Sequence, residues 1–520
     1  MRTTSSIFAV LALASLFACS STETVVVKGG GHGEDPSGTG ENGDPNGEGP
    51  GADPTNPEAP RAPLATGISV REIAIFQGTK VQLVKDGAAT KSTTAIVAGR
   101  PGLVRVYVKP DGTAAREITA ELRIEAGDKK QPLVRETKTI SKASTDDDTK
   151  TTFNLEVPAA YLTADATFSV ALTAADGTTP ADGAASTARF PTDGKQQALG
   201  VKAAGKLKVV VVPVKYDVDG SGRMPDVSEA QMKLYKETMM ARYPVTDVEI
   251  SLHAPMSWTS TIAANGSGFS QILSSITRLR GTDAAAKDVY YYGAFAPAPS
   301  FNSYCQGGCV TGLSTVVESV QVASMRASVG VGFSGPDAAN TMAHEVGHAH
   351  GREHAPCGGT RGADTAFPYS DGSIGNWGYD IINKKLYSPT KSFDMMGYCP
   401  NEWVSDYTYR ALFDRVSSVN KLMGTVTSGT VPSGSARLAV VDENGEMSWS
   451  TEPFVSDAIT GGDARTISYH DHAGLELGKA TARFYKFDHL PGGVLVVPES
   501  NVSSTWSHAK VAGFARTLAR

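Results

Sequence analysis

The chain has 520 residues, which is long enough for three domains, and its formal net charge is −6. A pI near 6.0 and the lack of a basic stripe argue against a nucleic-acid partner. Beyond the first twenty residues, no segment holds enough uninterrupted apolar residues to span a bilayer, so we expect the remainder to be soluble.

Residues 1–19 are predicted to be a targeting segment. Arg2 is their only charge, and the apolar run at 7–17 is too short to cross a bilayer. The following Leu-Phe-Ala-Cys resembles the lipobox of bacterial lipoproteins, which implies a lipid anchor on Cys19. Ser20 then favours, by the same resemblance, an outer-membrane or cell-surface location. Phe17 is unusual in a lipobox, so cleavage of an ordinary signal peptide and secretion are the alternative.

Residues 20–65 are predicted to form a disordered linker. From about Lys28 the composition changes to Gly, Pro, Asn, Ser and acidic residues. Such a segment cannot bury enough apolar surface to offset the entropy lost on ordering. We interpret it as a tether between anchor and folded body; a binding role for the acidic run is the alternative.

Residues 66–200 are predicted to form an immunoglobulin-like β-sandwich. Val104, Val106 and Val108 alternate with Arg105 and Tyr107, and the same period of two returns in three later segments, at 122–124, 153–157 and 168–172. The segment has no cluster of titratable residues. We therefore expect a spacer or a module that positions the substrate.

Residues 206–425 are predicted to alternate strands and helices, which indicates an α/β layer. Strands are expected at 207–214, 290–295 and 327–333; helices are expected after Pro225-Asp226, across 269–279 and after Ser405-Asp406. The loop that begins Asp217-Val218-Asp219-Gly220 starts like an EF-hand calcium loop. Its twelfth residue is Ser228, and Glu229 comes one place too late. We favour a polar turn there, with Ca²⁺ as the weaker alternative.

The segment from His344 to His354 reads H-E-x-x-H-x-x-G-x-x-H. On a helix, His344 and His348 lie one turn apart and can share one Zn²⁺, while Glu345 can reach a water molecule in an open cleft. Gly351 can adopt a positive φ and end the helix, so that His354 approaches the same ion from a loop. Three neutral imidazoles leave one position of a tetrahedral zinc open, as hydrolysis requires.

Two observations qualify this interpretation. His350 points away from the ligand face of the helix, and we expect it to be a surface or supporting group. A histidine-rich surface helix without a metal is the alternative for the whole segment. Gly351 and His354, at the fixed offsets of the motif, argue against a chance match.

The long motif resembles the signature of the metzincin zinc metallopeptidases, which also have a methionine-containing turn beneath the zinc. Residues 392–399 (Ser-Phe-Asp-Met-Met-Gly-Tyr-Cys) resemble that turn, with Met396 as its methionine. Tyr398 stands where some metzincins have a tyrosine that binds zinc or stabilises the transition state. The resemblance covers residues 206–425, and within the family the chain is most similar to bacterial secreted, mucin-cleaving enzymes of the dictomallein-like kind.

This resemblance implies a metzincin-type catalytic domain that hydrolyses extracellular proteins or glycoproteins with one zinc. His344, His348 and His354 would be its ligands, and Glu345 would act first as general base and then as general acid. A non-enzymatic surface adhesin that keeps the fold is the alternative, which the intact ligand set disfavours. We expect a monomer.

The four cysteines besides Cys19 form an even number in an exported chain, which favours disulfides. Cys305 and Cys309 are close in sequence. The metzincin resemblance would bring Cys357, which follows His354, near Cys399, which follows Met396, and so implies a second disulfide. A second zinc bound by cysteines is the alternative.

Residues 426–520 are predicted to form a small C-terminal β domain. Apolar strands are expected at 438–441 and 494–497, and the segment shows no evident chemistry. We expect His470, His472 and His489 to be surface groups and not ligands.

Overall fold

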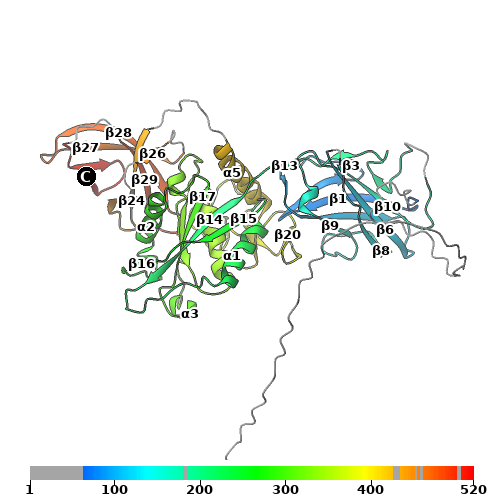
Figure 1. The fold of residues 1–520 in the computed structure, drawn as a ribbon, viewed down its shortest axis with the longest axis horizontal. Helices are drawn as coiled ribbons and strands as arrows, with labels where there is room; N and C mark the ends of the chain where they lie inside the picture. Colours follow the sequence, from blue (N-terminus) through cyan, green and yellow to red (C-terminus); the bar gives the residue numbers. More distant parts are fainter. Residues whose placement is uncertain are drawn as a thin grey trace, which may run out of the picture. The chain divides into compact units, whose positions relative to one another are not determined.

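The computed structural model describes residues 63–127, 129–179, 184–424, 434–450, 454–456, 461–499 and 505–520. The predicted targeting segment, Cys19 and nearly all of the predicted linker lie outside these ranges. Within them, no helix has both the length and the apolar character needed to cross a membrane. Most of the regular structure is β-sheet, arranged as several separate sheets with few helices (Figure 1).

Two sheets enclose the core of the N-terminal part. The first has the order β3-β2-β1-β5-β9, and the second has the order β11-β10-β6-β7, with β12 and β8 attached to β10 and β6. Ile73 and Val106 from the first sheet share one apolar cluster with Ile118 and Phe168 from the second. The apolar residues that alternate along the strands therefore face inward from two sheets and form one core between them. The bounds are β1 (Ile68–Phe76), β2 (Lys80–Lys85), β3 (Ala88–Ala89), β5 (Gly102–Pro110), β6 (Arg116–Ala126), β7 (Lys129–Lys130), β8 (Val134–Ile140), β9 (Phe153–Val157), η1 (Ala159–Tyr161), β10 (Thr167–Thr173), β11 (Arg189–Phe190) and β12 (Gln197–Ala198).

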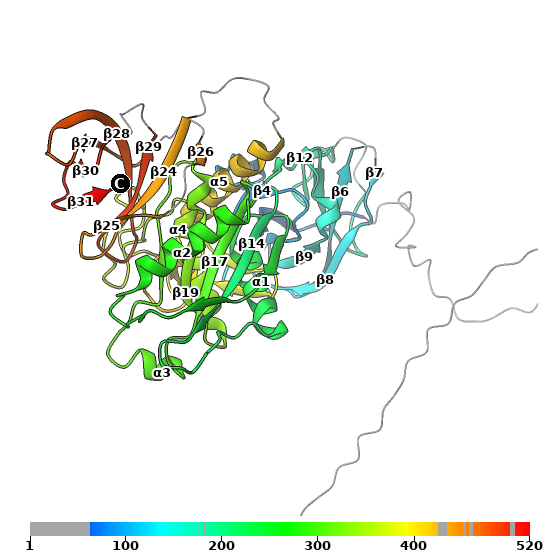
Figure 2. The same cartoon turned by 60° about the vertical axis from the view of Figure 1, so that its left-hand side comes forward.

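A mostly parallel sheet with the order β15-β14-β17-β19-β18 follows, and β16 also pairs with β14. The strands β14, β17 and β19 run side by side (Figure 2). The last strand of this order, β18, is antiparallel to β19. The near-continuous apolar runs of β14 and β17 fit strands that are covered on both faces. The bounds are β14 (Leu207–Tyr216), β15 (Val248–Leu252), β16 (Met256–Trp258), β17 (Val289–Phe295), β18 (Gly312–Ser314) and β19 (Ala327–Val331); a short parallel pair, β4 (Ile96–Val97) with β13 (Val201–Lys202), precedes this sheet.

Helices cover the two faces of this sheet. Val209 and Val211 of β14 share a core cluster with α1 (Glu229–Arg242) and α4 (Pro336–Ala349). Val212 and Val214 point to the other face, in a cluster with α2 (Phe269–Thr282). This alternation places α4, which carries the histidine motif, directly against the sheet. The other elements are α3 (Phe301–Tyr304), η2 (Ala323–Met325), β20 (Gly378–Asp380), β21 (Lys385–Tyr387), β22 (Phe393–Asp394), β23 (Glu402–Trp403) and α5 (Asp406–Gly424).

The calcium-like loop forms a polar turn at the end of β14. Asp219 accepts a hydrogen bond from the backbone N–H of Ser221 and makes an ion pair with Arg223 at 2.7 Å. Ser228, at the twelfth position, is instead the N-cap of α1 and accepts from Gln231 N–H. These local contacts use the Asp219 carboxylate and the Ser228 hydroxyl, two of the groups that a calcium loop would need for the ion.

A C-terminal sheet has the order β25-β24-β29-β28-β27-β30-β31, with β26 attached to β24. One of its faces contributes Leu438 and Val496 to the cluster that contains α2, while Ala439 and Val497 belong to a second core on the other face. The sheet therefore shares a core with the parallel sheet. The bounds are β24 (Gly434–Val441), β25 (Met447–Trp449), β26 (Phe454–Ser456), β27 (Asp463–His470), β28 (Glu476–Lys486), β29 (Gly493–Pro498), β30 (His508–Val511) and β31 (Thr517–Ala519).

Arg100 joins the N-terminal sheets to α1. Its fully buried guanidinium donates hydrogen bonds to the carbonyls of Gln77 at 2.9 Å and of Ala241 and Val245, both at 3.2 Å. Ala241 lies in the last turn of α1, where the unpaired carbonyls favour a cation. The arginine therefore satisfies buried carbonyls from two parts of the chain.

We predict that Arg100→Ala lowers the free energy of unfolding by about 2–4 kcal/mol, because buried carbonyls lose a charged donor and a cavity remains. Chemical unfolding of both proteins measures the difference. Lys129→Ala, at an exposed position of β7, is the control and should change stability by less than about 0.5 kcal/mol. An Arg100→Ala protein as stable as the control would contradict this account of the contact.

Candidate metal site

The end of α4 turns the chain so that three histidines converge. Gly351 has φ +81°, as predicted, and a Cβ there would lie 2.9 Å from the carbonyl oxygen of Val317. Only glycine fits this left-handed turn without strain. The turn returns His354 to the face of α4 that carries His344 and His348.

The structure brings the three predicted ligands together. The Nε2 atoms of His344 and His348 are 3.0 Å apart, and the rings of His348 and His354 have centroids 4.6 Å apart. All three side chains are buried. Their donor atoms belong to a group in which every ligand atom lies within 4.8 Å of the others, so the group could hold a metal ion.

Each imidazole uses its other nitrogen to contact a backbone carbonyl. The Nδ1 atoms lie 2.7, 2.6 and 2.9 Å from the carbonyl oxygens of Met395, Arg352 and Arg361, for His344, His348 and His354 respectively. A carbonyl only accepts, so each Nδ1 carries the proton and each Nε2 presents a lone pair.

This arrangement fits a cation. Burial lowers the pKa of His344 to about 3 and the pKa of His348 well below its usual value, so both rings stay neutral. Two neutral Nε2 lone pairs that face each other at 3.0 Å have no proton between them. A metal ion between the rings could be bound by both lone pairs. Histidine binds metals in its neutral form, which is the form that both rings have here.

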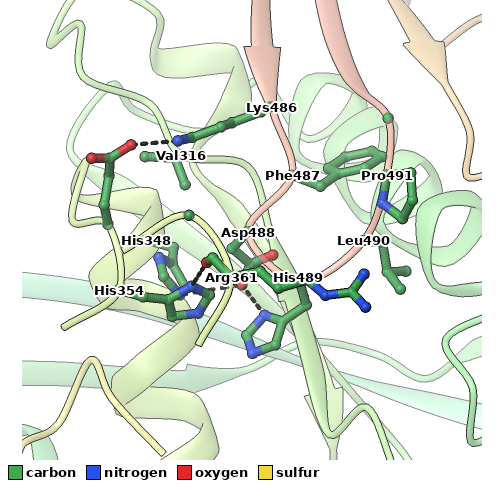
Figure 3. Close-up of a pocket in the computed structure, with 13 residues that line it drawn as sticks. Val316, His348, His354, Arg361, Lys486, Phe487, Asp488, His489, Leu490 and Pro491 are labelled. Atoms are coloured by element: carbon green, nitrogen blue, oxygen red, sulfur yellow. Dashed lines mark hydrogen bonds and ion pairs between the residues drawn. The ribbon is translucent and has the colours of Figure 1, made fainter. Parts of the chain in front are cut away.

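Two further residues reach the group from the C-terminal sheet. Asp488 and His489 follow β28 and point toward His348 and His354 (Figure 3). Asp488 Oδ2 lies 3.3 Å from Nε2 of His348 and accepts a hydrogen bond from Nδ1 of His489. Although burial raises its pKa, the contact with His489 holds the pKa of Asp488 well below its usual value. The aspartate is therefore a charged group beside the histidines.

The expectations for the remaining histidines need correction. His489 is not a surface group, and the C-terminal segment does contribute chemistry. His470 is buried and stacks on His508, with ring centroids 5.3 Å apart, whereas His472 is exposed as expected. His350 points away from the ligands, but it is buried. Its ring stacks on that of Tyr290, with centroids 4.2 Å apart, so it packs in the core.

Sequence reasoning missed Asp488 and His489 because they lie far along the chain and follow no ligand spacing. The sequence signal that could have pointed to this pair is the position of Asp488-His489, two polar residues between a strand and a Pro-Gly-Gly turn. Such a pair occurs in many hairpins and indicates a loop before it indicates a site.

Glu345 lies beside the three histidines. Its side chain is only 1% exposed, yet it lines a cavity of about 200 Å³ together with His344, Tyr398 and His489, so a cleft lies beside it as predicted. Its Oε2 atom has no hydrogen-bond partner among the described residues. Burial first, and then the Asp488 carboxylate, raise the pKa of Glu345 well above its usual value. A carboxyl group with this pKa can hold a proton at neutral pH.

Tyr398 stands at the outer side of the group. Its hydroxyl lies 3.0 Å from Nε2 of His354, and the residue is 44% exposed. Partial burial, followed by the charges of Asp488 and Glu345, raises the pKa of Tyr398 above its usual value. The hydroxyl therefore keeps its proton and can donate a hydrogen bond.

Met396 lies beneath α4, where a Cβ on Gly347 would come within 2.6 Å of its Sδ. The turn is held by buried Asp394, whose carboxylate accepts from the N–H groups of Met396 at 2.8 Å and Ser405 at 2.9 Å. The carbonyl of Met395 in the same turn contacts His344. The turn thus orients one ligand, and Asp394 is a supporting residue that sequence reasoning missed.

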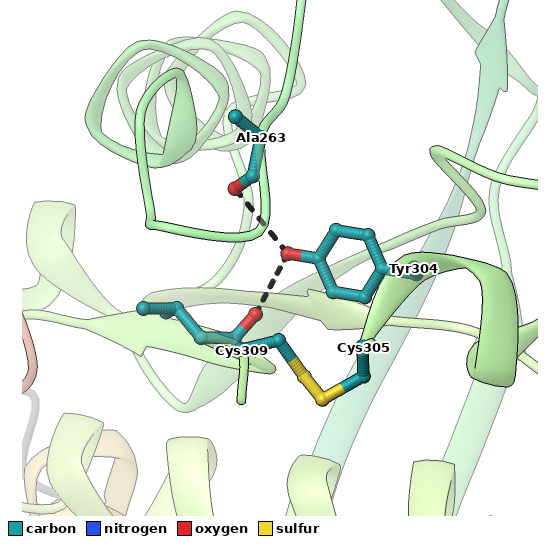
Figure 4. The surroundings of a disulfide bond; sticks show 5 residues. Ala263, Tyr304, Cys305 and Cys309 are labelled. Carbon is teal, nitrogen blue, oxygen red and sulfur yellow. Dashed lines mark hydrogen bonds between the residues drawn. A yellow bond between two sulfur atoms is a disulfide. The ribbon is translucent and has the colours of Figure 1, made fainter. Parts of the chain in front are cut away.

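Both predicted disulfides form. Cys357 pairs with Cys399, and Cys305 pairs with Cys309, so these residues are not available as thiolate ligands of a second zinc. Figure 4 shows the short bridge beside Tyr304, whose hydroxyl donates to the Val310 carbonyl at 2.8 Å. The longer bridge ties the segment after His354 to the segment after the methionine turn.

Comparison with known proteins points to a peptidase. Residues 324–404 match the family model described as Peptidase M66, and this segment contains the three histidines, Glu345 and Tyr398. A search of curated proteins found no match. Two solved structures of Bacteroides uniformis beta-glucuronidase, one of them a calcium-binding mutant of beta-glucuronidase 2, are each 11% identical with a TM-score of 0.13. Each match covers 44% of this chain and 27% of that chain, and so low a TM-score carries no argument.

We predict that the Cys357→Ser/Cys399→Ser double variant melts at a lower temperature and holds metal less tightly. The disulfide spans 42 residues, for which loop-closure entropy contributes about 4 kcal/mol. The matched control is Cys305→Ser/Cys309→Ser, whose bridge spans only 4 residues and contributes about 2 kcal/mol on the same scale. Equal melting temperatures for the first variant and the wild type would show that the longer bridge does not stabilise the site.

Proposed function

We propose that the chain is a zinc-dependent endopeptidase that hydrolyses extracellular proteins or glycoproteins. One observation carries this proposal: three imidazoles that carry their protons on Nδ1 bring their Nε2 atoms together beside a buried glutamate. The match of residues 324–404 to a peptidase family supports the coarser statement that the chain is a peptidase. The alternative of a surface adhesin has no comparable support.

The donor set suits zinc in particular. Nitrogen donors from three histidines with one position left for water or substrate are typical of catalytic zinc sites. A zinc ion held by His344, His348 and His354 supplies Lewis acidity, which polarises a peptide carbonyl and makes a water molecule more acidic.

The chain's own residues then move the protons. The deprotonated carboxylate of Glu345 takes a proton from the attacking water and passes it to the leaving amine; its raised pKa makes it a stronger base and allows it to hold that proton in between. Tyr398 donates its hydroxyl to the oxyanion that develops on the scissile carbonyl, a contribution of about 3 kcal/mol when such a donor is well placed. Its partial exposure leaves the hydroxyl accessible to a substrate.

The domain organisation that we propose agrees with this function. Residues 206–425 form a metzincin-type catalytic domain of the dictomallein-like kind, between an immunoglobulin-like sandwich at 66–200 and a β domain at 426–520. Support comes from the parallel sheet with α4 on one face and from the turn at Met396 beneath α4. We further propose a monomer anchored to the outer membrane through lipid on Cys19, with residues 20–65 as the tether.

The direct test is Glu345→Gln. Glutamine keeps the shape of the side chain but cannot take up the proton, so cleavage of casein or of a glycoprotein should fall by about 10²–10⁴-fold. Zinc content should stay near that of the wild type because no ligand is removed. Glu237→Gln, at a partly exposed position of α1, is the control and should cleave normally. Undiminished cleavage by Glu345→Gln would remove this residue from the mechanism.

A further inference from the structure

Asp488 reaches the candidate metal site from outside the segment that matches a peptidase family. We propose that Asp488 is a fourth protein ligand of the metal in the resting protein. The folded chain would then close the coordination position that hydrolysis needs, and an incoming substrate would have to displace this carboxylate. The inference rests on the zinc site of the proposed function.

The distance between the two donors supports ligation. Asp488 Oδ2 and His348 Nε2 are 3.3 Å apart, and both side chains are fully buried. Two donors that each lie about 2.0–2.1 Å from one tetrahedral zinc are about 3.3–3.4 Å apart. The spacing therefore matches two ligands of one ion.

The chemistry of the two atoms also favours a cation between them. Nδ1 of His348 contacts the Arg352 carbonyl, so Nε2 has no proton to offer to Asp488. A carboxylate oxygen and an imidazole lone pair repel each other at this distance in a buried site. An ion between them converts the repulsion into two bonds.

The backbone holds Asp488 in this position because residues 486–488 pair with the chain at the end of β18, as an added strand would. Val316 N–H donates to the Lys486 carbonyl at 3.2 Å, Thr315 and Phe487 form an antiparallel bridge, and Asp488 N–H donates to the Ser314 carbonyl at 3.3 Å. Ser314 N–H in turn donates to Oδ1 of Asp488 at 3.0 Å. The second carboxylate oxygen, Oδ2, is thereby aimed at the histidines.

This added strand occupies a position that a substrate could use. An extended peptide commonly binds by pairing with an exposed strand edge, and β18 is the strand that leads to the site. The segment Lys486–Asp488 pairs with the chain at the end of β18 and so resembles a bound peptide whose side chain contacts the metal. The closed site would limit cleavage until a substrate competes for it.

Release requires the Asp488 carboxylate to move and to give up its hydrogen bonds with Ser314 N–H and His489. Phe487 is buried in the core shared with α2, and Lys486 makes an ion pair with Glu353, so the strand itself is fixed. A cavity of about 360 Å³, lined by Asp488, His348 and His354 among others, adjoins the carboxylate. The side chain can turn toward this space while the backbone stays in place.

The test uses the full chain loaded with Co²⁺, whose absorption spectrum reports its ligands, titrated with acetohydroxamate. Asp488→Asn keeps the oxygen that accepts from Ser314 N–H but is a much poorer metal ligand. It should bind acetohydroxamate at least 10-fold more tightly than the wild type, and it should lose zinc to a chelator about 10–100-fold faster. Asp463→Asn, an exposed residue of the same sheet, should match the wild type in both measurements. Equal hydroxamate affinity in the wild type and Asp488→Asn would overturn the inference.

A measurement on the wild type does not depend on how the variant folds. Anomalous diffraction from zinc-loaded crystals should place a carboxylate oxygen of Asp488 about 2.0–2.2 Å from the ion. Zinc bound by the three histidines with Asp488 more than about 3.5 Å away would overturn this inference and leave the proposed function intact. A chain that binds no zinc at all would overturn both.

Discussion

The site depends on three hydrogen bonds between imidazole Nδ1 atoms and backbone carbonyls. They fix which nitrogen carries the proton in His344, His348 and His354, and so create three lone pairs that converge. The carbonyls come from the methionine turn and from the loop that follows α4. The rest of the structure holds these carbonyls: Asp394 braces the turn, Gly351 sets the direction of the loop, and the Cys357–Cys399 bridge ties the two segments together.

Burial has different consequences for neighbouring groups in this site. It lowers the pKa of His344 and keeps the ring neutral, whereas it raises the pKa of Glu345. Asp488 stays charged because the contact with His489 outweighs its burial. A neutral ligand set, a carboxyl group able to hold a proton and a charged carboxylate therefore lie within one small volume. Such separation of protonation states is typical of sites that perform acid–base chemistry.

The sequence predicted what depends on short spacing. The offsets among His344, His348 and Gly351 predict a helix and a turn, and the structure has both. Alternating residues such as Val104 and Val106 predict strands in the same way. Asp488 and His489 could not be predicted, because contact between residues 348 and 488 arises from the packing of a whole sheet against α2.

The central claim is that one zinc ion at this site makes the chain a peptidase. The most direct measurement removes metal from the purified full chain with a chelator and then adds zinc in steps while cleavage of casein is followed. The account predicts no cleavage by the metal-free protein and a rise to a plateau at about one zinc per chain. Cleavage that survives complete removal of metal, or a fully zinc-loaded chain that cleaves no protein or glycoprotein, would contradict it.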